Sequence, residues 1–401
     1  MIELIQLIIM IPLGFMSLYL VLLSILAFGH RNKVLSSARS VRKFAIVIPA
    51  HNEADCIGCT LAQLSTLDYP DHLYDLIVIA DNCSDPTARI AKERGAIVWA
   101  RTDQSKKGKG YALRWAFDRI LLQSEFTEKP YDSVVVLDAD SHVEPNILQV
   151  FNRYRESGAE VIQGFLGVPP NPDSWTTESI RIGLTLYNYI RPLGRKRLGL
   201  PSGLRGNGMC FSIHTLRQVP WNAFGQTEDL EYGLELLLKG VDVTFAPETI
   251  GYNRIPERAE TAESQRERWE MGRIPVLRQY AGKLAIASVR DRSLRIADAL
   301  IDLVTPPLVT TVLFMLMMAS LNAMLWWSGV TDSGLFTGLW LLLALSGSLH
   351  ALIGLAAAGV DRRTYSSLLH VPKYAIWKLL LYLKIMFVKG RTTSWVRTAR
   401  E

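Results

Sequence analysis

Two carboxylates end one of the most apolar segments of the sequence. Residues 131–142 read YDSVVVLDADSH, and the apolar run 134–137 leads directly into Asp138 and Asp140. An apolar run without alternation is typical of a strand covered on both faces, as in a parallel sheet. Residues two apart in a strand lie on the same side, so the two carboxylates repel each other unless a cation lies between them. This spacing predicts a divalent metal with oxygen ligands. The alternative is a solvated strand end with acidic N-caps for the next helix.

Polar residues also follow two other predicted strands. The strand 44–50 (FAIVIPA) is followed by His-Asn-Glu at 51–53, and the strand 74–81 (YDLIVIAD) ends in Asp, with Asn82 next. Strands alternate with helical segments from residue 42 onward, which indicates an α/β domain with a largely parallel sheet. Ligands of such sheets bind beyond the carboxyl ends of the strands. We therefore expect one ligand site along this edge.

Two further segments carry chemically useful residues. Residues 227–229 read Thr-Glu-Asp and precede apolar residues at helical spacing. Thr227 is expected to cap this helix, and the two acids favour its N-terminus. Residues 265–269 read QRERW and place Gln265, Arg268 and Trp269 on one helical turn. The alternative for Trp269 is an anchor at a membrane interface.

The composition is apolar for a chain with so many charges. Hydrophobic residues make up 49% of the 401 residues, charged residues make up 20%, and the mean hydropathy is +0.15. Three apolar segments are long enough to cross a bilayer, namely 4–28, 308–327 and 335–359. The first is too long for a signal peptide and lacks a basic start, so we expect an anchor.

Basic residues flank these segments on one side only. The segments 29–43, 289–295, 361–367 and 389–401 are basic, whereas the connection 328–334 has no Lys or Arg. Basic loops stay in the cytoplasm, so we expect a multi-pass protein of the bacterial cytoplasmic membrane with a cytoplasmic middle domain. The expected units are an N-terminal membrane helix (1–29), a catalytic domain (42–275), interfacial linker helices (276–302), two membrane helices (303–360), and an amphipathic interfacial helix with a basic tail (361–401).

Several other readings of the sequence are disfavoured. The net charge of +6 is explained by residues beside the membrane, and no basic stripe with interleaved aromatics indicates nucleic-acid binding. The four cysteines fall in the segment placed in the cytoplasm, so disulfides are not expected. Cys56 and Cys59 lack a second pair for a zinc site. The segment 106–110 (KKGKG) lacks the spacing of a phosphate-binding loop.

Five of these segments occur in a familiar order. IVIPAHNE, IADNCSDPT, LDAD, TED and QRERW lie between residues 44 and 273, and together with the flanking spans the chain resembles membrane-embedded family 2 glycosyltransferases. Its resemblance is to the synthases of cellulose, hyaluronan and poly-N-acetylglucosamine. This resemblance implies a GT-A fold, a Rossmann-like α/β domain. It also implies transfer from a nucleotide sugar, most often a UDP-sugar, with inversion at the anomeric carbon.

The resemblance also implies roles for individual residues. Asp229 is the expected general base, with Glu228 and Asp138 in the same catalytic group. Asp140 is the expected direct ligand of Mg²⁺ or Mn²⁺, with Asp138 beside it and His142 as a third candidate ligand. The expected contacts to donor and acceptor are Pro49, His51, Glu53, Asp81, Lys109, Asp138, Gln265, Arg268 and Trp269.

The acceptor and the partners stay open at this point. The chain has fewer spans than the polysaccharide synthases that form their own pore, so either export needs an oligomer or partner, or the acceptor is a lipid-linked saccharide. Residues 371–390 (VPKYAIWKLLLYLKIMFVKG) form a basic amphipathic helix suited to the membrane surface. Two alternatives from other classes are a nucleotidyltransferase and a non-catalytic protein that binds nucleotide sugars.

Overall fold

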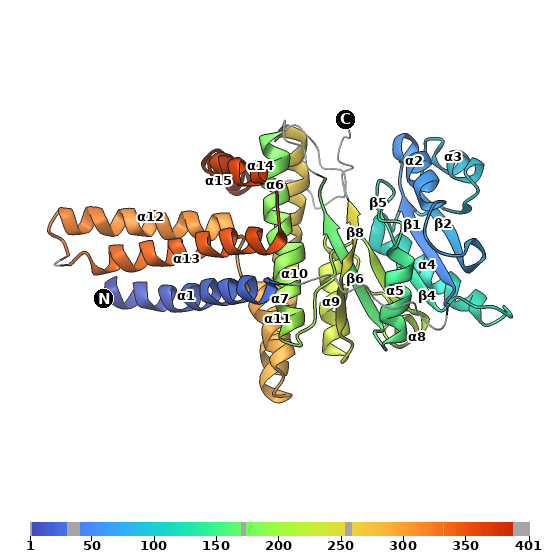
Figure 1. Ribbon diagram of the computed structural model, residues 1–401, viewed down its shortest axis with the longest axis horizontal. Coiled ribbons are helices and arrows are strands. Elements are labelled where there is room, and N and C mark those ends of the chain that lie inside the picture. Colours follow the sequence, from blue (N-terminus) through green and yellow to red (C-terminus); the bar gives the residue numbers. More distant parts are fainter. Residues whose placement is uncertain (1, 30–40, 170–173, 253–258, 332, 388–401) are drawn as a thin grey trace.

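A mixed sheet flanked by helices forms one side of the molecule, and three long helices project from the other side (Figure 1). The computed structural model describes residues 2–29, 41–169, 174–252, 259–331 and 333–387, and in these ranges the side chains other than those of 2, 259–266 and 383–387. Between the sheet and the projecting helices lies a layer of helices that run across both.

The sheet has the strand order β3-β2-β1-β4-β7-β6-β8-β5. Its strands are β1 (Phe44–Ala50), β2 (Tyr74–Asp81), β3 (Ile97–Arg101), β4 (Ser133–Val136), β5 (His142–Val143), β6 (Val161–Gly167), β7 (Met209–Ser212) and β8 (Val243–Tyr252). The strands β1 to β4 pair in parallel, which confirms the predicted parallel arrangement. The second half is mixed, because β7 runs antiparallel to both β4 and β6, whereas β8 is parallel to β6.

Both faces of the central strands are covered, as the apolar runs require. One face carries α2 (Ala54–Leu64), α3 (Thr87–Glu93) and α5 (Ile147–Glu156), and the other carries α4 (Lys109–Ser124), α8 (Ile213–Gln218) and α9 (Glu228–Leu238). A short turn of helix, η1 (Asp71–Leu73), precedes β2. In β4, Val135 packs in the core of the first face, and Val134 and Val136 pack in the core of the second. This two-sided burial explains why the strand before Asp138 has no polar alternation.

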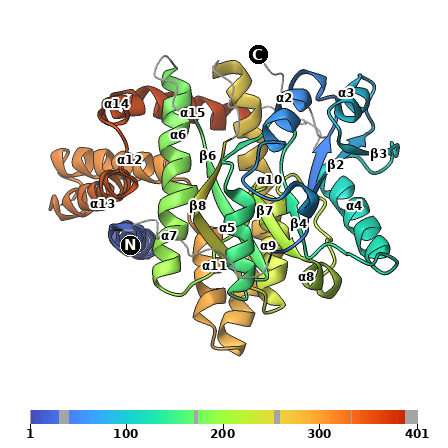
Figure 2. The same cartoon turned by 45° about the vertical axis from the view of Figure 1, so that its right-hand side comes forward.

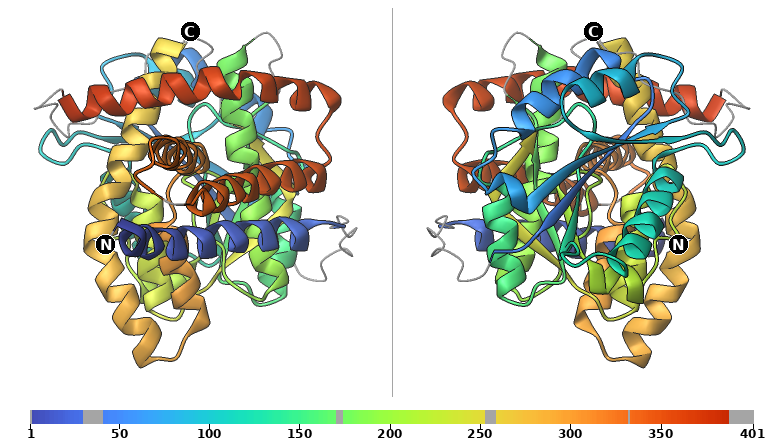
Figure 3. Two further views of the ribbon diagram at one scale, coloured as in Figure 1. Left: turned by 90° about the vertical axis from the view of Figure 1, so that its left-hand side faces the viewer. Right: turned by 90° about the vertical axis from the view of Figure 1, so that its right-hand side faces the viewer.

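The crosswise layer contains two long helical segments (Figures 2 and 3). One is the continuous run α6 (Trp175–Thr185), η2 (Leu186–Ile190) and α7 (Arg191–Arg197), and the other is α10 (Ala259–Arg290) followed by α11 (Leu294–Val304). The chain ends in α14 (Arg362–Ser367), η3 (Leu368–His370) and α15 (Val371–Phe387), which crosses the layer at one end. Because α10 is unbroken, the helix that carries QRERW extends across the boundary expected near residue 275.

The three projecting helices are α1 (Ile2–Ala27), α12 (Leu308–Trp327) and α13 (Leu335–Ala358). In the described part of the chain, three helices are long and apolar enough to cross a membrane: Glu3–Ala27, Leu308–Trp327 and Leu335–Ala358. They agree with the predicted segments to within one residue at each end. Gln6 ties all three together, because its Nε2 donates to Asn322 Oδ1 over 2.9 Å and its Oε1 accepts from Trp340 Nε1 over 2.9 Å. Residues 30–40 of the basic segment 29–43, and the whole basic segment 389–401, lie outside the described residues.

Candidate active site

The loops after β1 and β2 are joined to each other by polar contacts. His51 Nδ1 lies 2.7 Å from the backbone oxygen of Asp81, and Asn52 Oδ1 accepts from the backbone N–H of Ser84 over 2.8 Å. Asn52 and Asn82 both have positive φ values, 56° and 51°, a conformation that asparagine tolerates better than most residues. The two strand ends therefore form one fixed edge, with Pro49 inside β1 and the buried Glu53 directly before α2.

Asp81 is buried at this edge and pairs with an arginine that the sequence analysis did not identify. Asp81 is 5% exposed, and its Oδ1 accepts from Arg101 Nη1 and, over 3.1 Å, from Asn82 Nδ2. Burial raises the pKa of the Asp81 carboxyl, and the Arg101 guanidinium opposes this shift. Arg101 lies opposite Asp81 in the parallel pairing of β2 and β3. Only this register brings the two together, so the sequence alone carried no signal for the pair.

A lysine connects the end of β4 with the start of α9. Lys109 Nζ lies 2.6 Å from Asp138 Oδ1, 2.5 Å from the Gly206 carbonyl oxygen and 3.8 Å from Glu228 Oε1. Burial favours the neutral amine, but Asp138 and Glu228 outweigh it and raise the pKa of Lys109. We call Lys109, Asp138, Glu228 and Asp229 the lysine cluster. It joins the start of α4, the end of β4 and the start of α9.

The loop 203–208 holds the lysine cluster in place. Asn207 Oδ1 accepts from the backbone N–H of Asp138 over 3.2 Å, and its Nδ2 donates to Ser141 Oγ over 2.8 Å. The loop turns at Gly206, whose φ is +82°, and a Cβ there would lie 3.3 Å from Asp229 Oδ2. A larger residue would therefore be both strained and in contact with the Asp229 carboxylate. The glycines of GLRGNG were visible in the sequence, but no role was assigned to them.

Glu228 and Asp229 begin α9 with their carboxylates largely buried. Burial, together with the neighbouring Asp229 charge, raises the pKa of Glu228 to about 7, although Lys109 opposes the shift. Burial likewise raises the pKa of Asp229, against the effect of the backbone N–H of Leu230 and of Lys109. A carboxylate whose pKa moves toward neutrality is a better proton acceptor at physiological pH than an exposed one.

The helix α10 packs against the start of α9. Thr227 is the residue before α9, but its side chain does not cap the helix, so the predicted capping hydrogen bond is wrong. Thr227 Oγ1 instead donates to the Gly272 carbonyl oxygen of α10 over 3.0 Å, and a Cβ on Gly272 would lie 2.8 Å from Thr227 Cγ2. Arg268 and Trp269 lie one turn before Gly272 on the same side of α10. The packing thus brings TED and the second half of QRERW together, whereas the side chain of Gln265 lies outside the described residues.

The carboxylates after β4 do not act as helix caps. The residue before α5 is Asn146, so the alternative in which Asp138 and Asp140 cap the next helix is wrong. His142 is exposed on β5 and lies opposite Tyr252 of β8. Among the described side chains no group of three His, Cys, Asp or Glu residues is arranged to hold a metal. Asp138 and Asp140 offer oxygen donors that suit Mg²⁺ or Mn²⁺, which commonly take the rest of their ligands from substrate phosphates.

The cysteines do not form a metal centre among the described residues. All four are free, Cys56 and Cys210 being buried and Cys59 exposed. Cys83 lies beside the β1 loop, where the backbone N–H of Asn52 points at its sulfur over 3.4 Å, and burial raises its thiol pKa. A raised pKa keeps the thiol protonated and unreactive.

Comparison with known proteins places this arrangement in a family. Residues 42–272 match the family described as "Glycosyltransferase like family 2". The chain is 28% identical over 243 residues to the beta-monoglucosyldiacylglycerol synthase of Trichormus variabilis, covering 57% of this chain and 48% of that protein. It is 24% identical over 282 residues to the poly-beta-1,6-N-acetyl-D-glucosamine synthase of Staphylococcus epidermidis, covering 66% and 64%. The matches thus span about half to just under two thirds of these relatives.

A solved structure agrees with the fold over nearly the whole chain. The mannosyltransferase PcManGT from Pyrobaculum calidifontis, solved in complex with GDP-Man and Mn²⁺, superposes with a TM-score of 0.57. The alignment covers 97% of this chain and 100% of that one at 12% identity, so the likeness concerns the fold alone. The predicted GT-A fold is confirmed, and the chain belongs to glycosyltransferase family 2.

Proposed function

We propose that the protein transfers a sugar from a nucleotide sugar, with inversion, to an acceptor hydroxyl at the cytoplasmic face of a membrane. One observation carries the proposal: Lys109 Nζ lies 2.6 Å from Asp138 Oδ1 and 3.8 Å from Glu228 Oε1. The carboxylate after β4 belongs to the side where a diphosphate would bind, and Glu228 neighbours the candidate base Asp229. A transferase must hold the diphosphate and the base no farther apart than the two sides of one sugar ring.

The donor is expected to bind along the edge formed by the ends of β1 and β2. Uracil presents an N–H between two carbonyl oxygens, and a buried carboxylate beside a guanidinium can pair with such a pattern. Asp81 and Arg101 form such a pair. A guanine base also presents N–H donors, and the solved mannosyltransferase binds GDP-Man. Competition between UDP and GDP for binding to the purified protein decides between the two, and we expect UDP to bind more tightly.

A divalent cation is expected to join the donor to the end of β4. Asp140 and Asp138 would hold Mg²⁺ or Mn²⁺ together with oxygens of the diphosphate, and His142 is a further candidate ligand. When bound, the cation neutralises charge that grows on the leaving diphosphate. Lys109 and Arg268 supply further positive charge to the same group. The carboxylate-rich lysine cluster, with three acids around one amine, is electrostatically suited to a cation.

The acceptor hydroxyl must lose a proton as the new bond forms. Inversion requires one carboxylate on the face of the sugar opposite the leaving group. Asp229 is our candidate for this base, because it begins α9 beside Lys109 and next to the segment of α10 that carries Trp269. Glu228 holds Lys109 in place, and Trp269 offers an apolar face on which an acceptor sugar can stack.

The acceptor is a growing polysaccharide or a lipid-linked saccharide. One relative is named as a poly-N-acetylglucosamine synthase and another as a glucosyldiacylglycerol synthase. The second kind of acceptor is favoured by the position of α10, which belongs both to the candidate site and to the layer next to the projecting helices. A single addition to a lipid-linked acceptor needs no pore, whereas export of a polymer needs an oligomer or a partner.

Two experiments test this function. The anomeric configuration of the product, followed by NMR from an α-linked donor, should be β, and an α product would contradict inversion.

For the membrane position, a cysteine introduced at Ser333, in the connection between α12 and α13, should react with an impermeant reagent added to cells. A cysteine introduced at Ser37 should not react. The reverse labelling pattern would place the candidate active site outside the cell, where it has no access to cytoplasmic nucleotide sugar.

A further inference from the structure

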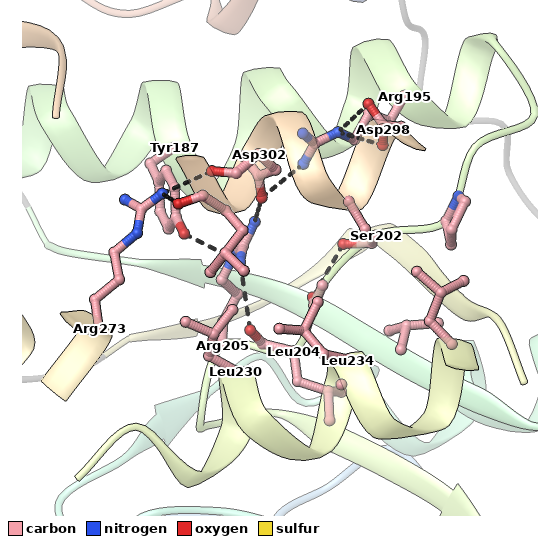
Figure 4. Close-up of a pocket in the computed structure, with 17 residues that line it drawn as sticks. Tyr187, Arg195, Ser202, Leu204, Arg205, Leu230, Leu234, Arg273, Asp298 and Asp302 are labelled. Atoms are coloured by element: carbon pink, nitrogen blue, oxygen red, sulfur yellow. Dashed lines mark hydrogen bonds and ion pairs between the residues drawn. The ribbon is translucent and has the colours of Figure 1, made fainter. Parts of the chain in front are cut away.

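A second buried charge cluster lies beside the loop 203–208, between α7, α9 and α11 (Figure 4). We call Arg191, Arg195, Arg205, Asp298 and Asp302 the arginine cluster. Asp302 lies 2.6 Å from Arg191, 3.0 Å from Arg195 and 3.9 Å from Arg205, and Arg195 lies 3.0 Å from Asp298. All five side chains are at least 88% buried.

The arginine cluster carries more positive than negative charge. Three guanidiniums share two carboxylates, and Asp229, which attracts Arg205 electrostatically, already faces Lys109. A fourth guanidinium, that of Arg273, donates to the backbone oxygens of residues 302, 303 and 305 at the end of α11. Thus, among the described side chains, these four cations face three anions, Asp298, Asp302 and Asp229. A buried charge without a counter-charge is strongly unfavourable.

Several N–H donors in the cluster make no hydrogen bond to the described part of the protein. Arg191 Nε, Arg195 Nη2, and both Nε and Nη2 of Arg205 are buried and make no hydrogen bond among the described residues. The guanidiniums of Arg205 and Arg191 lie 4.3 Å and 5.0 Å from the centre of the Tyr187 ring, which offsets part of their charge. An aromatic ring cannot satisfy the in-plane N–H groups, so these donors still need an acceptor.

A small cavity is lined by both cationic and apolar side chains. Arg195, Arg205 and Arg273 line it together with Leu230, Leu234 and Leu303. The cavity has a volume of ≈ 40 Å³, which is enough to hold water. Water molecules could accept the free hydrogen bonds but would leave the excess charge in place. A phosphate group in the cavity would both accept hydrogen bonds from the free donors and balance the excess positive charge.

The cavity lies at the inner end of the first projecting helix. Asp298 accepts a hydrogen bond from Tyr19 of α1, and Gly194 packs so closely on α1 that a Cβ there would lie 2.4 Å from the Leu23 backbone oxygen. On its other side Arg205 precedes Gly206, which contacts Asp229. In a membrane-bound protein this places the cavity at the depth of lipid headgroups, between the bilayer and the candidate base.

We propose that this cavity is a phosphate-binding site. Its position favours a phosphate carried by a membrane lipid, with free phosphate as the alternative source of the same group. The membrane position rests on the function proposed above, whereas the anion site itself does not depend on sugar transfer. Its test can therefore be a binding measurement without donor, so that failure of the site and failure of the enzymatic proposal are distinguishable.

The test measures the thermal unfolding of the full chain in a phosphate-free, uncharged detergent. Dihexanoyl phosphatidic acid at about a hundredfold excess over its Kd should raise the Tm by about 3 °C. Dihexanoylglycerol, which has the same chains without the phosphate, should not. A similar rise with inorganic phosphate would support the site with a soluble source of phosphate. No rise with either phosphate compound would overturn the proposal.

Two variants make the test specific. Arg205→Gln removes excess positive charge, so without ligand it should unfold at a temperature at least equal to that of the unaltered protein, and phosphatidic acid should then protect it less. Leu234→Phe fills the cavity without changing its charge and should also lose the protection. Arg155→Gln is the matched control, because Arg155 is a mostly buried arginine paired with Glu160 elsewhere, and its protection should persist. If phosphatidic acid raised the Tm of Arg205→Gln and of Leu234→Phe as much as it raises the Tm of the unaltered protein, the site would be wrong.

Discussion

The lysine cluster and the arginine cluster are built from the same groups in opposite proportions. In the first, one amine faces three carboxylates, and in the second, three guanidiniums share two carboxylates. The two lie on either side of the loop 203–208, whose Arg205 and Gly206 reach one cluster each. The imbalance of a buried cluster indicates the charge of the ligand that it needs. We therefore assign a metal cation to the lysine cluster and a phosphate to the arginine cluster.

The largest expected effect concerns the base in the lysine cluster. Asp229→Asn should lower turnover about a hundredfold or more, since that is the usual contribution of a general base. Binding of the nucleotide should stay nearly unchanged, because its expected contacts lie on β1 and β2. Steady-state kinetics and calorimetric titration with UDP separate the two. Asp118→Asn, an exposed change on α4, is the control. Transfer by Asp229→Asn at a near-normal rate would show that Asp229 serves only the helix terminus.

The next effect concerns the cation that Asp138 of the lysine cluster and the neighbouring Asp140 are expected to hold. Asp138→Asn and Asp140→Asn should each lower turnover by about a hundredfold, because charge on the leaving diphosphate is then poorly neutralised. Both should also raise the Mn²⁺ concentration needed for half-maximal rate, whereas Asp242→Asn, which alters an exposed ion pair, should not. If Asp140→Asn kept full activity in excess chelator, the metal site would be wrong.

A smaller effect is expected at the acceptor. Trp269→Ala should raise the acceptor KM up to about tenfold, since a stacked ring contributes on the order of 1 kcal/mol, and slow hydrolysis of the donor should persist. Trp327→Ala alters an exposed tryptophan at the end of α12 and serves as the control for a membrane-interface role. Equal effects of both changes would favour that role for Trp269.

The smallest effect is a change in the pH dependence of stability. The pKa of Glu228 is raised to about 7 in the folded protein from an ordinary value near 4.5, so the native state holds a proton that the unfolded chain has released. The contribution of Glu228 to the free energy of unfolding should fall as the pH rises from about 4.5 to about 7 and should then level off. Glu228→Gln should remove this fall and be the more stable form above pH 7. The exposed change Glu93→Gln should leave the fall in place.

The sequence predicted those parts of the site that depend on local order along the chain. The ends of β1, β2 and β4 follow from apolar runs with polar residues behind them. The pairing of Asp81 with Arg101 could not be predicted, because it depends on the register of β2 against β3. Likewise Thr227 stands directly before α9, where a capping residue is expected. Because α10 lies close by, its hydroxyl instead donates to the Gly272 carbonyl oxygen.

The arginine cluster shows the same limit more strongly. Its members come from α7, from the loop before β7, and from α11, so that about a hundred residues separate Arg195 from Asp298. None of them belongs to a local sequence pattern that predicts a buried charge. Only the packing of α1 against α7 and α11 shows that they are buried together.

The release of nucleotide diphosphate by the purified full chain tests the central claim most directly. The protein should be incubated with a panel of UDP-sugars and GDP-sugars, with Mn²⁺ or Mg²⁺ or with chelator, and in the presence of lipid extract as a source of acceptor. We predict release from at least one UDP-sugar, only with a metal present, and its loss in Asp229→Asn. Binding of nucleotide sugar without any release from the whole panel would contradict the account and indicate a non-catalytic binding protein.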